Sequence, residues 1–132
     1  MAVLSVADGI LRPTGRSSFV ADTAALAATY FRAWQDRDFE LFRSVLADDV
    51  TFDGPMGQAR NADECVQGVK GLSQIVTGIV IRRVFVDGDD VTTWFELHTS
   101  ATSEPMLVAN WCHVRDGKIA TIRVTFDPRP LG

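Results

Sequence analysis

The stretch LVANWCHVRDGKIATIRVTFD, residues 107–127, decides the fold of this chain. Two runs rich in β-branched and aromatic residues, 107–115 and 118–127, stand on either side of Asp116-Gly117. Asp-Gly between alternating apolar residues is a strong hairpin signal, because both central positions of the turn need a positive φ. The pattern therefore predicts a long antiparallel hairpin.

The alternation of side chains along a strand divides this hairpin into two faces. Asn110 is an amide on a face that is otherwise apolar, and Trp111 lies on the opposite face. A buried amide without partners costs about 1–3 kcal/mol, so a ligand, a water molecule or another side chain must satisfy Asn110. The predicted inner face consists of Val108, Asn110, Cys112, Val114, Ile122, Val124 and Phe126.

A second hairpin is predicted upstream, where residues 79–86 and 91–99 flank the turn sequence DGDD. Alternation along its second strand places Trp94 on the same outer face as Trp111 and His113. Contiguous exposed aromatic side chains usually mark contact surfaces. We therefore expect a homodimer that packs through this convex face.

Helical patterns precede the two hairpins. Residues 22–36 carry apolar side chains at intervals of three and four, with Asp22 or Thr23 as the cap, and residues 39–46 form a shorter amphipathic helix. A short strand is predicted at 50–53, and Asn61 with Glu64 resembles a capping box that opens a helix to about residue 78. The fold class expected is α+β, with three helices on one face of an antiparallel sheet.

Length and composition predict one ordered domain. A chain of 132 residues buries about two-thirds of the surface that its unfolded form exposes, so it needs no disulfide or metal to fold. Residues 19–132 are expected to form the domain. Residues 1–18 lack sustained periodicity and are expected to form an extension that is either mobile or packed on a neighbour.

Charge and residue counts restrict the partners. A net charge of −4 provides no basic surface for nucleic acid. The sequence contains neither a signal peptide nor a run of about 18–20 apolar residues, so we expect a cytoplasmic protein without membrane contact. The two cysteines are expected to be reduced and buried. Two histidines without metal-type spacing predict no metal site, and we expect no cofactor.

The order of elements resembles the nuclear transport factor 2-like superfamily, and within it the SnoaL-like polyketide cyclase and ketosteroid isomerase branch. The resemblance covers residues 22–130. It rests on YFRAWQDRDFELFRSVLADDVTFDGP, VFVDGDDV and ANWCHVRDGKIATIRVTFDPRP. It implies a strongly curved sheet that wraps around the helices as a cone, with an apolar pocket at the open end and dimers through the convex face.

Ketosteroid isomerases use an Asp base beside an oxyanion hole built from a Tyr and a protonated Asp. By this resemblance Tyr30 matches the oxyanion tyrosine, and Asn110 matches the neutral acid. The resemblance therefore makes Tyr30 a candidate partner for the Asn110 amide, beside a ligand or a water molecule. The base position matches Gly54, and the nearest carboxylate is Asp53, one residue earlier. The candidate catalytic residues are therefore Tyr30, Asp53 and Asn110. The candidate ligand-binding residues are Trp34, Phe52, Gly54, Cys112 and Phe126.

Two functions remain open at this point. In the first, the pocket binds a small, mostly apolar molecule through a carbonyl oxygen, with or without catalysis of proton transfer in an isomerisation or aldol-type cyclisation. In the second, a dimeric module binds ligand without turnover or docks another protein. The direction of Asp53 separates them, and strand alternation predicts that it faces away unless a bulge or the Gly54-Pro55 turn redirects it. Asp127 is expected to form an end-of-strand turn.

Overall fold

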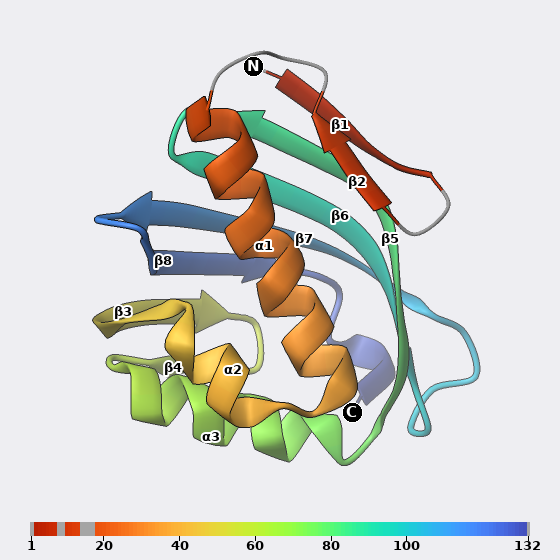
Figure 1. The fold of residues 1–132 in the computed structure, drawn as a ribbon. Coiled ribbons are helices and arrows are strands. Elements are labelled where there is room, and N and C mark those ends of the chain that lie inside the picture. Colours follow the sequence, from red (N-terminus) through yellow and green to blue (C-terminus); the bar gives the residue numbers. More distant parts are fainter. Residues whose placement is uncertain (1, 8–9, 14–17, 132) are drawn as a thin grey trace.

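The computed structural model describes residues 2–7, 10–13 and 18–131, and the side chains of residues 22–131. Three helices lie inside a curved sheet that does not close (Figure 1). The helices are α1 (Ser18–Asp36), α2 (Phe39–Ser44) and α3 (Ala62–Ser73). The strands are β1 (Ala2–Ala7), β2 (Ile10–Pro13), β3 (Leu46–Gly54), β4 (Gly57–Ala59), β5 (Val76–Asp87), β6 (Asp90–Thr99), β7 (Met106–Arg115) and β8 (Lys118–Thr125), and a 3-10 turn, Arg129–Leu131, follows.

The α+β class is confirmed, but the sheet is mixed and not wholly antiparallel. Its strand order is β2-β1-β5-β6-β7-β8-β3-β4, and β3 runs parallel to β8. A parallel pair needs a long crossover, and here the chain from β3 to β8 passes through α3 and the other long strands. α1 packs across the concave side of the sheet (Figure 1).

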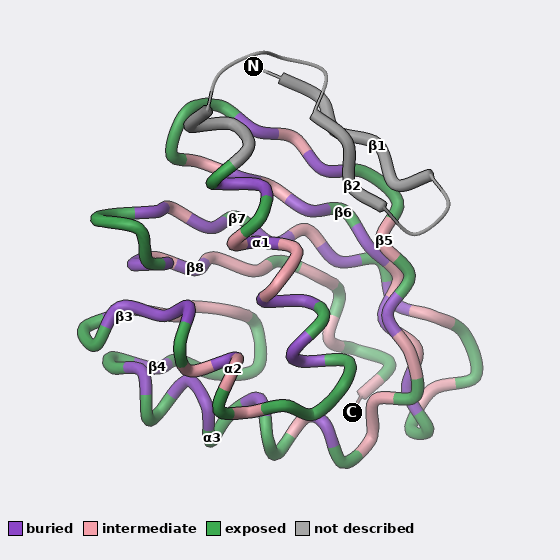
Figure 2. The backbone as a smooth tube through the Cα atoms, in the orientation of Figure 1, coloured by how far each residue is buried: buried purple, intermediate pink, exposed green. Residues whose placement is uncertain are grey.

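The hairpin predicted from Asp116-Gly117 is confirmed. Both residues have positive φ, 52° and 76°, as the turn requires. The register pairs Asn110 with Val124 and Cys112 with Ile122 across β7 and β8. Buried positions alternate with more exposed ones along β7, as Figure 2 shows. The predicted inner face is therefore the face that meets the helices.

Helix boundaries differ from the expected ones where packing overrides local signals. α1 begins at Ser18, so Thr23 does not cap it; instead the Thr23 hydroxyl donates to the Gly88 carbonyl at 2.8 Å. α3 ends at Ser73, about five residues early, because the chain from Val76 onward is already part of β5. The Asn61 cap is confirmed, with its side chain accepting from the Glu64 backbone at 2.8 Å.

Strands also occur where none was expected. Within residues 1–18, β1 and β2 form a hairpin, and β1 pairs with β5 at the edge of the sheet. Between the strand predicted at 50–53 and the helix opened by Asn61, the chain forms β4, which pairs with the end of β3. Ser18, the last residue of the predicted extension, begins α1, and the remaining residues of the extension lie outside the described part of the chain.

Candidate functional site

An apolar cavity of about 200 Å³ lies between α1, α3 and the concave side of the sheet. α1 contributes Tyr30 and Trp34, because residues four apart share one face of a helix. The sheet contributes alternate residues of its inner face. The remaining lining residues are Phe52, Gly54, Pro55, Met56, Gly57, Gln58, Ala59, Glu64, Cys65, Gly68, Val69, Leu72, Phe95, Leu97, Val108, Asn110, Val124 and Phe126.

Asn110 and Tyr30 are buried polar residues of this lining, and the structure brings them together as predicted. Each has only 2% of its surface exposed. Asn110 Nδ2 lies 3.4 Å from Tyr30 Oη and donates toward it. Tyr30, one of the three partners that the sequence left open for the amide, is therefore in hydrogen-bond contact with it.

Cys112 fixes the orientation of the Asn110 amide. Its thiol donates to Asn110 Oδ1 with an Sγ–Oδ1 distance of 3.1 Å. Burial raises the pKa of Cys112 far above its ordinary value, with the nearby Cys65 adding to the effect, so the thiol stays protonated and acts as the donor. The amide oxygen therefore faces Cys112, and the amide nitrogen faces Tyr30.

Cys112, Asn110 and Tyr30 form a chain of two hydrogen bonds that ends at the Tyr30 hydroxyl. Burial raises the pKa of Tyr30 well above its ordinary value, so the phenol keeps its proton. Its oxygen accepts from Asn110, and among the described residues no acceptor takes its hydrogen. A phenol O–H and the second Asn110 N–H are thus the donors that an oxygen atom of a ligand would meet.

Asp53 does not line the cavity. Its neighbours Phe52 and Gly54 do, so the alternation of β3 holds at this point. The register irregularity of β3 lies before Thr51 and therefore does not redirect Asp53. The carboxylate instead forms salt bridges with Arg60 and Arg123, each at 3.0 Å, and the hydrogen bond from Arg60 is the main cause of its lowered pKa.

The model of the SnoaL-like domain family matches residues 27–122, well over half of the chain. The chain belongs to the SnoaL-like domain family. The matched segment includes Tyr30, Trp34 and Asn110 but ends before Val124 and Phe126. The comparison with curated protein sequences finds no match.

Solved structures confirm the predicted NTF2-like fold. An NTF2-like protein of unknown function from Cytophaga hutchinsonii is 24% identical, covers 83% of this chain and 93% of its own, and has a TM-score of 0.71. An LEH-like epoxide hydrolase from M. tuberculosis is 21% identical, covering 85% and 87% with a TM-score of 0.72. A candidate ketosteroid isomerase from Kribbella flavida is 21% identical, covering 82% and 79% with a TM-score of 0.70. Identities this low establish the fold alone.

The structure separates the residues predicted for the site of this SnoaL-like domain into three places. Trp34, Phe52, Gly54 and Phe126 line the cavity with Tyr30 and Asn110. Cys112 lies behind Asn110 and outside the lining. Asp53 lies on the other side of the sheet, where it pairs with Arg123 of β8.

Glu64 is the acidic residue of the cavity lining, and sequence reasoning did not select it as a site residue. It is exposed, which places it where the cavity opens to solvent. One of its oxygens, Oε1, accepts from the backbone nitrogen of Arg60 at 2.8 Å. Its place in the capping pattern was a visible signal, but that pattern indicates a helix start and gives no reason to expect a cavity.

The convex face of the sheet carries the predicted aromatic residues. Trp94 is 38% and Trp111 41% exposed, and Leu107 beside them is 54% exposed. The Trp111 indole and the His113 ring both contact Asp90 Oδ1, at 2.9 and 2.8 Å. The expected outward direction of Trp94, Trp111 and His113 is confirmed.

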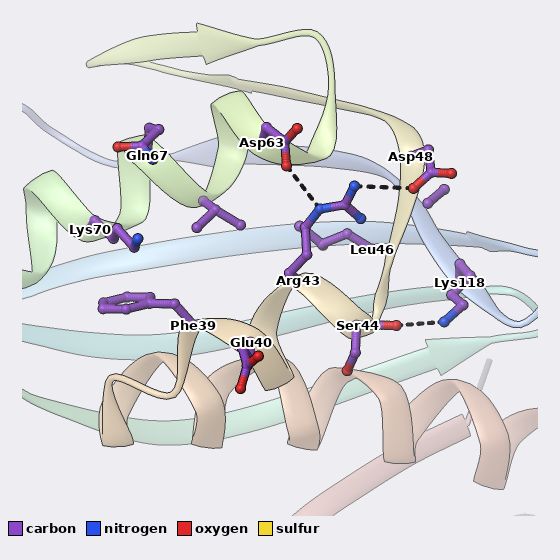
Figure 3. Close-up of a pocket in the computed structure, with 12 residues that line it drawn as sticks. Phe39, Glu40, Arg43, Ser44, Leu46, Asp48, Asp63, Gln67, Lys70 and Lys118 are labelled. Carbon is purple, nitrogen blue, oxygen red and sulfur yellow. Dashed lines mark hydrogen bonds and ion pairs between the residues drawn. The ribbon is translucent and has the colours of Figure 1, made fainter.

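A second hollow, of about 800 Å³, is wider and open to solvent. It lies between α2, α3 and the start of β3 (Figure 3). Arg43 lies in it and forms salt bridges with Asp48 at 3.2 Å and with Asp63 at 3.1 Å. Arg43 is already paired with two carboxylates, so its charge is not free to bind a ligand. The apolar cavity is therefore the better candidate for a ligand site.

The described residues contain no group of three or more His, Cys, Asp or Glu side chains placed to hold a metal ion. Within the same part of the chain, no helix is both long enough and apolar enough to cross a membrane. Asp127 forms the predicted turn, accepting from the backbone nitrogen of Arg129 at 3.0 Å.

Proposed function

We propose that this SnoaL-like domain binds a compact, mostly apolar molecule and receives one carbonyl-type oxygen at Tyr30 and Asn110. The observation that carries the proposal is the buried Tyr30–Asn110 pair in a lining that is otherwise largely apolar. Ligand sites usually combine apolar walls with a few polar groups that fix orientation. The Tyr30 hydrogen, which no described residue accepts, favours a ligand oxygen as its partner.

The size of the cavity restricts the ligand class. Ligand pockets usually measure about 300–1,000 Å³, and this cavity is smaller, at about 200 Å³. A compact ketone, enone or single aromatic ring therefore suits it better than a four-ring steroid.

A thermal-shift screen tests the binding proposal. Compact cyclic enones and small polyketide-like aromatics should raise the melting temperature of the wild type, whereas steroids should not. Asn110→Leu keeps the volume but removes the amide, so it should lose most of the shift. Glu40→Gln, at an exposed position of α2 outside the apolar cavity, is the control. Equal shifts of the melting temperature in wild type and Asn110→Leu would show that Asn110 does not contribute to binding.

Proton transfer next to the carbonyl is the second candidate function. Glu64 favours it, because this carboxylate lines the cavity in which the oxygen would be held. A base must come within hydrogen-bond reach of the proton that it removes. Tyr30 and Asn110 would stabilise the enolate oxygen while Glu64 moves the proton.

Hydrogen–deuterium exchange at the carbon next to the carbonyl separates turnover from binding. With a ligand from the screen, wild type should accelerate the exchange followed by NMR. Glu64→Gln should abolish the acceleration, and Asp53→Asn should leave it nearly unchanged. The reverse order would assign the base to Asp53, and no acceleration in any variant would leave binding alone.

We also propose that the chain forms a homodimer through the convex face that carries Trp94, Trp111 and His113. The exposure of both tryptophans and of Leu107 on one sheet face supports this arrangement.

A further inference from the structure

Trp34 contributes a polar N–H group to the cavity lining, and this group takes no part in the hydrogen bonds among Cys112, Asn110 and Tyr30. Its indole nitrogen is buried and has no hydrogen-bond partner among the residues that the structure describes. The side chain is 6% exposed and lines the same cavity as Tyr30, which precedes it by one turn of α1. Buried N–H groups are normally paired, so an unpaired one calls for an explanation.

Within residues 22–131, whose side chains are described, no oxygen or nitrogen atom accepts from the Trp34 indole. Its ring packs among Phe31, with ring centroids 6.2 Å apart, and Phe95, with centroids 6.0 Å apart and planes at 88°. An N–H directed at the face of the Phe95 ring is a weak interaction that could account for the geometry without a ligand. The alternative is an acceptor that arrives in the cavity.

We propose that Trp34 Nε1 donates a hydrogen bond to a second acceptor atom of the ligand, so that the cavity selects compact molecules with two acceptor oxygens. Dicarbonyl compounds and ketones with a hydroxyl or ether oxygen belong to this class. The first oxygen meets Tyr30 and Asn110, and the second meets the indole. The inference rests on the proposed function, because it needs the first oxygen to be held at Asn110.

Residues 30 and 34 suit this division of roles. Side chains four positions apart on a helix are neighbours on one face, with about 5–6 Å between their Cβ atoms. Both side chains extend from α1 and line the same cavity. Apart from Asn110, the lining residues of the inner sheet face are apolar and offer no side-chain hydrogen-bond donor. The donors for the two ligand oxygens would therefore come from Asn110, Tyr30 and Trp34.

The test compares cyclohexanone with cyclohexane-1,4-dione, which share a ring but differ by one acceptor. The chain contains three tryptophans, so a ¹⁵N-labelled sample gives three indole signals, and Trp94→Phe and Trp111→Phe assign them. The dione should move both the Asn110 side-chain amide and the Trp34 indole proton, shifting the latter downfield and slowing its exchange with solvent. Trp111, already bonded to Asp90, is the internal reference.

Affinity gives a second readout. One additional neutral hydrogen bond corresponds to about fivefold tighter binding. The wild type should therefore prefer the dione by about that factor, and Trp34→Phe should bring the ratio of the two affinities close to one. If Trp34→Phe fails to fold, the indole signals of the wild type still decide the question.

The outcomes separate this inference from the proposed function. If both probes move the Asn110 amide while the Trp34 indole is unchanged, the function stands and the inference is wrong, with Phe95 as the partner of the indole. If neither probe moves the Asn110 amide at any concentration reached, both are wrong.

Discussion

Asn110 does at neutral pH what a carboxyl group could do only when protonated. The amide donates to Tyr30 while its oxygen accepts from Cys112, and neither role depends on a proton that can be lost. A carboxyl at the same buried position would be forced toward its neutral form, because burial disfavours the charged form. The choice of amide therefore keeps the donor available over the whole physiological pH range.

Asn110→Asp should make stability depend on pH. The introduced carboxyl has a raised pKa in the folded state, so the folded state binds the proton more strongly than the unfolded state does. The variant should therefore approach the wild type below about pH 4 and lose stability as pH rises, by about 1.4 kcal/mol for each unit of pKa elevation. Urea unfolding at several pH values measures this. A variant whose deficit is the same at pH 3 and pH 8 would contradict the burial argument.

At the level of single residues, sequence could predict what a repeating pattern determines. Strand period placed Asn110 inward and Trp111 outward, and both directions are confirmed. The cavity position of Glu64 and the unpaired indole nitrogen of Trp34 could not be predicted in the same way. Glu64 has the pattern of a helix cap, and the missing partner of the Trp34 indole depends on which side chains surround it in space.

The short elements around the cavity mouth show why some strands were missed. β4 consists of Gly57, Gln58 and Ala59, none of which favours a strand, and it forms because the turn after Gly54 returns the chain alongside β3. β3 itself begins at Leu46, in front of two exposed aspartates that give no strand signal. Its parallel pairing with β8 joins segments about 70 residues apart, which local periodicity does not encode.

Asp53 connects β3 with β8 and with the residue that follows β4. It lies on β3, and it pairs with Arg60 just beyond β4 and with Arg123 on β8. Because Arg60 and Arg123 lower the pKa of Asp53, the folded state holds the charged form more strongly than the unfolded state does. The contribution is therefore present above the ordinary aspartate pKa of about 3.9 and is lost as pH falls through the lower folded value.

Asp53→Asn should reduce the loss of stability on acidification. Between about pH 5 and pH 2, the urea midpoint of the wild type should fall more steeply than that of the variant. The effect should be small, since the pair is partly exposed and screened by salt. Arg60→Gln removes the main cause of the pKa shift and should flatten the curve in the same direction. Parallel wild-type and Asp53→Asn curves would show that these contacts do not stabilise the folded state.

At the scale of the whole molecule, the two faces of the sheet carry different sets of side chains. The concave side holds the helices and the cavity, while the convex side aligns Val80, Glu96 and Leu107 in one row across three strands, with Trp94 and Trp111 in the next rows. Among the described residues, the large hydrophobic side chains that remain exposed are these four apolar ones and Met56. Their concentration on one face is unusual for a surface that meets only water.

The proposed homodimer makes a prediction at this scale. Truncating both tryptophans in Trp94→Ala/Trp111→Ala removes the aromatic anchors that dominate interface energy, each worth about 2 kcal/mol or more at a central position. Light scattering should show a dimer for wild type and a monomer for the double variant at micromolar concentration. Met56→Ala, an exposed hydrophobic at the cavity mouth, should stay dimeric. A dimeric double variant would place the interface elsewhere, whereas a monomeric one that still binds ligand would show that the cavity works within a single chain.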